Sequence, residues 1–189
     1  MSHRLTAAQD DPILDAARAT VLDFGVRRAT VAEVARRAGL SRMTVYRRYP
    51  DGAALIRALM AREFGDLVGR VDGEITGLAT GLERAVAATV RTVELLGEHP
   101  LMRRLLELEP EVLLPYLTDK VGRFQELARG ELARRIREGQ QDGSIRAGDP
   151  ERMAAAVETA CRGFAYAAAA QERPDLGELR ALVESYLRA

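Results

Sequence analysis

The chain has 189 residues, 47% of them hydrophobic, with 28 basic and 28 acidic side chains and a formal net charge of zero. This composition excludes a disordered chain, and the single cysteine excludes an internal disulfide framework and a cysteine-rich zinc site. The longest apolar run, residues 164–170, is far shorter than the roughly 18 residues that a membrane helix needs. The sequence therefore predicts a cytoplasmic protein that does not enter a membrane.

Helices are expected along almost the whole chain, because apolar residues recur at helical spacing and no segment alternates as a strand would. The fold class is therefore all-α, with about nine helices. A bend is expected at Pro115, and residues 140–144 read as a turn. In chain order, we expect helices over residues 12–24, 30–39, 41–49, from 51 onward, 81–97, 100–109, 111–140, 150–170 and 174–189.

The starts of these helices carry local signals. Asp11 precedes a proline, Thr30 opens the capping-box sequence Thr-Val-Ala-Glu, and Ser41 and Asp51 are further capping residues. Asp149, which precedes Pro150, caps a later helix in the same way. Pro174 is expected to start the last helix.

Glycines stand at every fourth position from Gly65 to Gly81, within an otherwise helical pattern. Each glycine inside a helix costs about 1 kcal/mol relative to alanine. Two interpretations follow: one long helix packed closely on a neighbour, or a helix that breaks near Gly73. We favour the long helix.

The charge is distributed unevenly between the two ends of the chain. Residues 1–50 hold nine arginines against five acids, whereas residues 51–189 hold 19 basic and 23 acidic side chains. This asymmetry predicts an anionic partner at the N-terminal end only. No nucleophile elbow, phosphate-binding loop, dinucleotide fingerprint or zinc-protease motif is present, so we expect no enzymatic activity, no cofactor and no metal site.

Residues 30–49 have the pattern of a helix-turn-helix motif. Two short capped helices are joined by a turn that contains Gly39, so the second helix is free to enter a DNA groove. The hydroxyls of Thr44 and Tyr46 can bind phosphate oxygens, and arginine can contact guanine in the major groove. The outer face of the second helix is expected to carry Arg42, Met43, Tyr46 and Arg47.

With these residues in view, segment 30–50 resembles the DNA-binding domain of the tetracycline-repressor (TetR) family of bacterial transcription regulators. The resemblance implies an Ω-shaped homodimer, with a DNA-binding domain over residues 1–50 and a helical effector-binding and dimerisation domain over 51–189. It also implies that the last two helices dimerise as a four-helix bundle. By position, Thr30 and Tyr46 match phosphate-contacting places. Family positions that face DNA bases or the DNA backbone are matched by Arg42, Met43, Thr44 and Arg48. With Arg47, these residues are our candidate DNA-binding residues.

One position departs from the family pattern. Relatives usually carry a lysine at the start of the fourth helix, often as Ser-Lys-Glu. Here the same place reads Asp51-Gly52-Ala53. A phosphate contact that is common in the family is therefore expected to be missing at Gly52.

Two further sets of residues are predicted in the C-terminal domain. An apolar effector is expected among side chains that point inward, namely Met60, Phe64, Val90, Met102, Tyr116 and Phe124. Cys161 is expected to be a buried structural thiol and not a redox sensor. The dimer interface is expected to contain Val157, Cys161, Gly163, Phe164, Leu179, Leu182, Val183 and Tyr186.

The sequence thus predicts a ligand-responsive regulator that binds double-stranded DNA. We expect a homodimeric repressor of a palindromic operator, which a small-molecule effector releases. The alternatives are an activator or a constitutive regulator of the same fold, a helical scaffold protein, and a helical enzyme.

Overall fold

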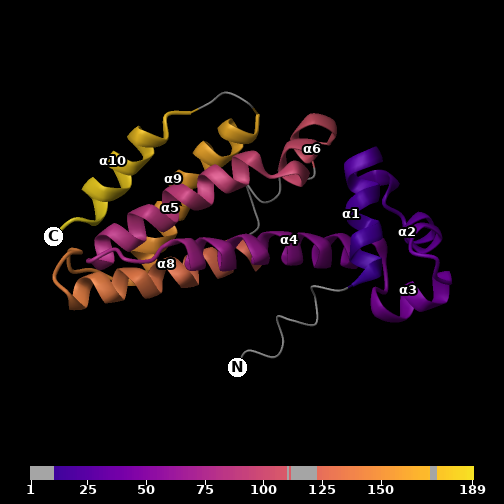
Figure 1. The fold of residues 1–189 in the computed structure, drawn as a ribbon, viewed down its shortest axis with the longest axis horizontal. Helices are drawn as coiled ribbons and strands as arrows, with labels where there is room; N and C mark the ends of the chain where they lie inside the picture. Colours follow the sequence, from indigo (N-terminus) through magenta and orange to yellow (C-terminus); the bar gives the residue numbers. More distant parts are fainter. Residues whose placement is uncertain (1–10, 110, 112–122, 171–173) are drawn as a thin grey trace.

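The computed structural model describes residues 11–109, 111, 123–170 and 174–189, and these ranges form nine α-helices and no strand (Figure 1). The all-α prediction is confirmed. No helix in these ranges is long and apolar enough to cross a membrane. The elements are α1 (Pro12–Phe24), a 3-10 turn η2 (Val26–Arg28), α2 (Val31–Arg37), α3 (Arg42–Arg48), α4 (Gly52–Glu74), α5 (Gly81–Glu98), α6 (Pro100–Leu108), α8 (Arg123–Gln141), α9 (Pro150–Ala169) and α10 (Leu176–Leu187).

The long helix α4 connects two groups of helices. Helices α1, α2 and α3 gather at its N-terminal end, while α5 and α8 pack against its other half and carry α9 and α10 (Figure 1). Each group has its own apolar core. Leu55 and Leu59 of α4 are fully buried in the core of the N-terminal group, although they follow residue 50, the predicted domain boundary.

The predicted helix starts are confirmed at five side-chain caps. Each cap accepts a hydrogen bond from a backbone N–H two or three residues further on, and the five caps are Asp11, Thr30, Ser41, Asp51 and Asp149. The capping box predicted at Thr30 is only half formed, because the Glu33 carboxylate accepts from Arg36 and Arg37 instead. A complete box forms at Thr80.

Two predicted boundaries differ from the structure or lie outside it. The last helix begins at Leu176 and not at Pro174, because the Asp175 side chain accepts the N–H groups of Gly177 and Glu178 and caps the helix there. Of the predicted 111–140 helix, residues 112–122, which include the bend expected at Pro115, lie outside the described residues.

Helix α4 runs without interruption through Gly65 and Gly69 and ends at Glu74, one residue after Gly73. The long-helix interpretation is therefore correct up to that point, and the chain then leaves the helix. The close packing on a neighbour that this interpretation included is not seen in the part of the chain that the structure describes. There, a Cβ atom added at Gly65, Gly69 or Gly73 would meet nothing within 4 Å apart from its chain neighbours and its own helix backbone.

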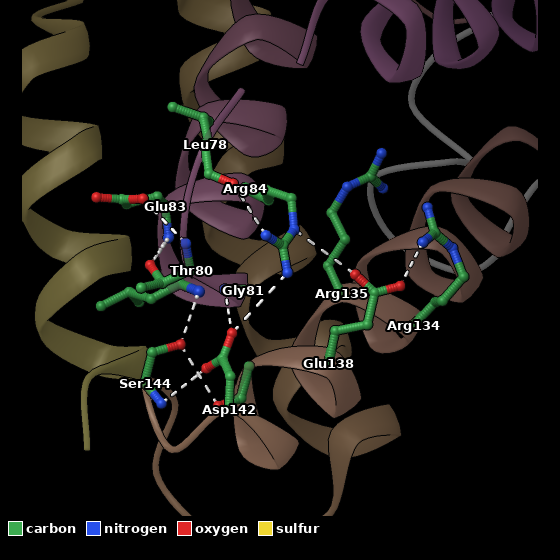
Figure 2. Close-up of polar contacts among 12 residues, drawn as sticks. Leu78, Thr80, Gly81, Glu83, Arg84, Arg134, Arg135, Glu138, Asp142 and Ser144 are labelled. Atoms are coloured by element: carbon green, nitrogen blue, oxygen red, sulfur yellow. Dashed lines mark hydrogen bonds and ion pairs between the residues drawn. The ribbon is translucent and has the colours of Figure 1, made fainter. Parts of the chain in front are cut away.

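A turn after α8 caps the start of α5 (Figure 2), at the end of the molecule farthest from α1–α3 (Figure 1). The Asp142 carboxylate accepts the N–H of Gly81 at 2.6 Å, and the Ser144 hydroxyl oxygen accepts the N–H of Leu82 at 3.0 Å. Figure 2 also shows the guanidinium of Arg84 reaching Asp142, with its Nη2 atom 3.9 Å from the carboxylate. The free N–H groups of the first turn of α5 thus receive partners from a distant segment.

The same turn brings three helices together. Gly81 of α5 crosses Gly139 of α8 so closely that a Cβ atom on Gly81 would lie 2.3 Å from the Cα atom of Gly139. The backbone N–H of Arg146 binds the carbonyl of Leu187 at 2.9 Å, which attaches the end of α10. The far end of the bundle is therefore fixed by backbone contacts as well as by apolar packing.

Candidate DNA-binding surface and effector cavity

The helix-turn-helix motif is formed by α2, α3 and the tight turn between them. Gly39 in this turn has φ +67°, a conformation that favours glycine. Val34, Ala35 and Val45 are buried between the helices. This packing fixes α3 against α2 and leaves the opposite face of α3 to solvent.

The exposed face of α3 carries the predicted DNA-contacting residues. Met43 is 75% exposed and Tyr46 is 46% exposed, and Arg42 and Arg47 are also exposed. Thr44 is half-buried, and its hydroxyl lies 2.9 Å from that of Ser41. Thr30 caps α2 through its oxygen and is exposed, so its hydroxyl hydrogen remains available to a phosphate.

Arg48 differs from its neighbours on α3. Its Nη2 atom lies 3.2 Å from the buried carboxylate of Asp11, which also accepts the hydroxyl of Tyr49 at 2.6 Å. Burial and the Asp11 carboxylate raise the pKa of Tyr49 to about 12. Arg48 therefore joins α3 to the start of α1, and its predicted DNA contact stays a prediction.

The positive charge of α2 is largely compensated within the protein. Glu33 binds both Arg36 and Arg37, and Arg37 also pairs with Asp23 at 2.7 Å. The hydrogen bonds from the two guanidinium groups, that from Arg36 first, lower the pKa of Glu33 to about 2. We therefore expect the exposed arginines of α3 to contribute more to the attraction to DNA than those of α2.

Replacing Arg42 by alanine is expected to weaken binding to the preferred DNA site by about 1–3 kcal/mol and to relax base preference at one position. The physical reason is the loss of a bidentate guanidinium contact to guanine. Fluorescence anisotropy on a panel of single-base operator variants measures both effects. Arg137→Ala, at the far end of α8, serves as the charge-matched control. Equal losses on every sequence would show that Arg42 touches phosphate only.

At the start of α4, Asp51 accepts the N–H of Ala54 at 2.6 Å, which occupies a helix N-terminus that could otherwise hold a phosphate. We expect Gly52→Lys to restore one phosphate contact per subunit. Among the described residues, nothing apart from its chain neighbours and its own helix backbone lies within 4 Å of a Cβ added at Gly52, so a lysine side chain has room there. Each contact steepens the slope of log K against log salt by about 0.9, so a dimer gains about 1.8.

Salt titrations on specific and on random DNA test this expectation, since phosphate contacts carry no sequence information. Gly130→Lys, an exposed glycine of α8, adds the same charge away from the DNA-binding helices. An unchanged slope in an intact Gly52→Lys dimer would place the start of α4 away from the DNA backbone.

A cavity of about 110 Å³ lies among α4, α5, α6, α8 and α9. Its walls include Val71 of α4, Val93 of α5 and Leu132 of α8, and most of the other lining side chains are also apolar. Small-molecule sites in proteins have this composition, mainly apolar with a few polar groups. The cavity is therefore the candidate effector site.

Of the six predicted effector residues, the structure places only Met102 in the cavity wall. Phe64 is buried against His99, with ring centroids 5.3 Å apart. Met60 and Val90 are partly buried and pack against the core. Tyr116 and the side chain of Phe124 lie outside the described residues. Sequence reasoning missed the contribution of α9, which lines the cavity with Val157, Glu158, Cys161, Arg162, Ala165 and Tyr166.

Cys161 is buried, as predicted, and it also lines the cavity. Burial, with a smaller contribution from Glu158, raises the pKa of its thiol to about 12. The thiol is therefore protonated at neutral pH and a poor nucleophile, which argues against a redox sensor.

The predicted dimer residues divide into two groups. Val157, Cys161, Leu179 and Val183 are buried in the core of their own protomer, so they have no surface to offer a second copy. They were predicted in the interface because the family resemblance implies dimerisation through α9 and α10. In the structure these residues belong to the protomer core, where α9 packs on α5 and α8, and α10 packs on α5 and α9. The residues that keep solvent-accessible surface are Gly163, Phe164, Leu182 and Tyr186.

The two groups of helices also touch through the end of α6. Glu109 is only 6% exposed, and its carboxylate accepts the backbone N–H groups of Val26 and Arg27. Arg104 donates from Nε to the carbonyl of Leu22 at 2.8 Å and from Nη2 to that of Asp23 at 3.1 Å. Arg104 thus binds the last turn of α1, and Glu109 binds the first residues of η2, so α6 is hydrogen-bonded to the chain before and after Gly25.

Comparisons with known proteins agree with this arrangement. Residues 13–59 match the family described as bacterial regulatory proteins, tetR family. The chain is 35% identical to the HTH-type transcriptional regulator Rv2250c of Mycobacterium tuberculosis over 147 residues, which cover 77% of this chain and 74% of that protein.

Among solved structures, the transcriptional repressor QsdR of R. erythropolis, from the TetR family, matches with a TM-score of 0.69 at 17% identity, over 93% of this chain and 92% of that one. A structure that addresses the control of antibiotic production by bacterial hormones matches with a TM-score of 0.68 at 25% identity, over 94% and 96% of the two chains. These relatives are regulators and not enzymes. The chain belongs to the TetR family of helix-turn-helix transcriptional regulators.

Proposed function

We propose that this protein is a homodimeric repressor that binds a palindromic operator in the cytoplasm and leaves it when a small molecule enters the cavity. The observation that carries the proposal is that helix α4 belongs both to the cavity wall and to the core of the DNA-binding domain. Val68 and Val71 line the cavity. Leu55 and Leu59 of the same helix are buried in the core that α1–α3 form. A ligand that changes the position of α4 therefore changes the position of α3.

Helix α6 provides a second connection between the cavity and the DNA-binding end. Met102 lines the cavity, and Arg104 and Glu109 hold the end of α1. A dimer reads two successive major grooves only when its two reading helices lie about 34 Å apart. An effector with higher affinity for a different spacing shifts the population away from the DNA-bound form.

Two structural neighbours support a small-molecule effector. The Bacillus subtilis regulator FadR was solved in complex with stearoyl-CoA, and SmeT was solved in complex with triclosan, with TM-scores of 0.58 and 0.65 to this chain. Both are at or below 22% identity, so they share the fold and do not name the ligand.

Selection of random DNA fragments by the purified protein, followed by footprinting, tests the proposal. We expect one inverted repeat with half-sites about one helical turn apart and binding that weakens steeply with salt. Transcription in vitro from a promoter that overlaps this site should fall when the protein is added. An increase would identify an activator, and binding without sequence preference would contradict the operator model.

A further inference from the structure

Met43 is the most exposed large apolar side chain in the part of the chain that the structure describes. It is 75% exposed, whereas the next two, Phe24 and Leu182, are each 47% exposed. A single exposed apolar side chain is common on protein surfaces and has no meaning by itself. The place of Met43 on its helix and the chemistry of its neighbours therefore decide what it does.

Met43 stands in the first turn of α3, two residues after the capping residue Ser41. Helix α3 lies at the outer edge of the N-terminal group of helices (Figure 1). In a helix-turn-helix motif, the N-terminal residues of the second helix contact base edges in the major groove. When α3 binds DNA, Met43 is thus placed toward the bases and not toward the phosphates.

The neighbours of Met43 on α3 are suited to hold this end of the helix against DNA. Arg42 and Arg47 are exposed and form no ion pair with any residue that the structure describes. Tyr46 and Arg47 follow Met43 by three and four positions, so they share its face of the helix. Two uncompensated guanidinium groups beside Met43 attract the DNA, and close approach of the helix then removes water from the Met43 side chain.

A methionine side chain has no hydrogen-bond donor, and its thioether sulfur is only a weak acceptor. Most groups on the floor of the major groove are donors or acceptors, and an apolar side chain that covers one of them leaves it unpaired, which is unfavourable. The C5-methyl group of thymine is the apolar group in this groove. Contact between Met43 and this methyl group buries apolar surface on both partners, so thymine is favoured over the other bases at this place.

We infer that Met43 is a specificity-determining residue that selects a thymine in each operator half-site through its C5-methyl group. This inference rests on the proposed function, because it requires a specific operator with two equivalent half-sites. The contact is apolar and uncharged. It therefore adds sequence preference without the salt dependence that phosphate contacts produce.

Operator fragments in which deoxyuridine replaces one thymidine at a time test the inference, since deoxyuridine lacks the methyl group and keeps the hydrogen-bonding edge. The operator is the sequence that the protein itself selects from random DNA, and fluorescence anisotropy measures affinity. At one thymine of the half-site, we expect replacement to weaken binding about fourfold in one half-site and about 15-fold in both, from the burial of one methyl-sized group. An operator without such a thymine overturns the inference.

Variants at position 43 assign the effect to this side chain. Met43→Gln keeps the length of the side chain but ends in an amide, so it should bind the thymine and deoxyuridine operators equally. Met43→Leu remains apolar and of similar volume and should keep the discrimination. Leu127→Gln introduces the same amide at an exposed residue of α8 and should also keep it. Full discrimination in Met43→Gln overturns the inference, as does a loss that appears only in Tyr46→Ala.

Two further measurements separate the inference from folding and from the proposed function. Met43 carries no charge, so Met43→Gln should bind random DNA within about twofold of the parent, which shows that the DNA-binding domain is intact. If the parent selects no preferred sequence, the proposed function fails, and this inference fails with it. If the parent selects an operator in which no deoxyuridine replacement weakens binding, the proposed function stands and the role of Met43 does not.

Discussion

A Gly163→Leu protein is expected to sediment as a monomer and to lose tight operator binding. Gly163 is exposed on α9, and among the described residues no atom outside its immediate chain neighbours and its own helix backbone lies within 4 Å of an added Cβ. Phe164 of the same helix, and Leu182 and Tyr186 of α10, also keep apolar surface in contact with solvent. We propose that this surface meets a second copy, where a leucine at position 163 would separate the two α9 helices.

The expected loss in operator affinity is about a hundredfold or more, because two linked half-site contacts gain roughly 10²–10⁴ over one. Analytical ultracentrifugation and anisotropy on the full palindrome measure the two effects. Gly130→Leu is the matched control, since Gly130 is also an exposed helical glycine with open space around it, on α8. A dimeric, DNA-competent Gly163→Leu protein would place the interface on another face.

The second large effect is expected at Glu109. Glu109→Gln replaces a carboxylate that accepts two backbone N–H groups by an amide that offers one oxygen and one NH₂ group. One of the N–H groups of Val26 and Arg27 then loses its acceptor, which costs about 1–3 kcal/mol. We expect chemical denaturation at fixed protein concentration to show this loss, and hydrogen exchange to show faster opening of residues 22–28.

Glu107→Gln is the control for this change, because Glu107 stands near the same end of α6 but is exposed and pairs only weakly with Arg104, at 3.4 Å. In the Glu109 variant, an effector should also reduce operator affinity by a smaller factor than in the parent. The reason is that α6, which together with α4 connects the cavity to the DNA-binding end, is then held less firmly. A variant as stable and as responsive as the parent would show that α6 does not hold the DNA-binding end.

The helix-turn-helix motif could be predicted from the sequence because its determinants are local. Thr30 and Ser41 cap helices a few residues away, Gly39 meets the backbone requirement of the turn, and the helical period alone brings Arg42 and Tyr46 to one face. Each of these signals acts within one or two helical turns. None depends on how distant segments pack.

The cavity could not be predicted in the same way, because its walls come from five helices whose relative rotation is set by packing. Helix α9 shows the difficulty: it has apolar residues on two faces, and the sequence alone does not tell which face covers the protomer core. Val157 and Cys161 were predicted in the dimer interface and lie in the core of their own protomer. The contact of Glu109 with Val26 spans 83 positions and has no local signal at all.

The Asp142–Ser144 turn fixes the start of α5 to the end of α8, and these two helices also hold the C-terminal end of α4. Helix α4 can therefore tilt about that end. The end of α4 is attached to the same two helices, through Glu74 to Arg91 of α5 and through Asp72 to Arg135 of α8. Helix α4 has 23 residues, and at a rise of 1.5 Å per residue it is about 35 Å long. A tilt of about 5° around this fixed end moves the other end by about 3 Å. In a symmetric dimer the two displacements add, so a small rotation near the cavity changes the separation of the reading helices by about 6 Å, a large fraction of a groove width.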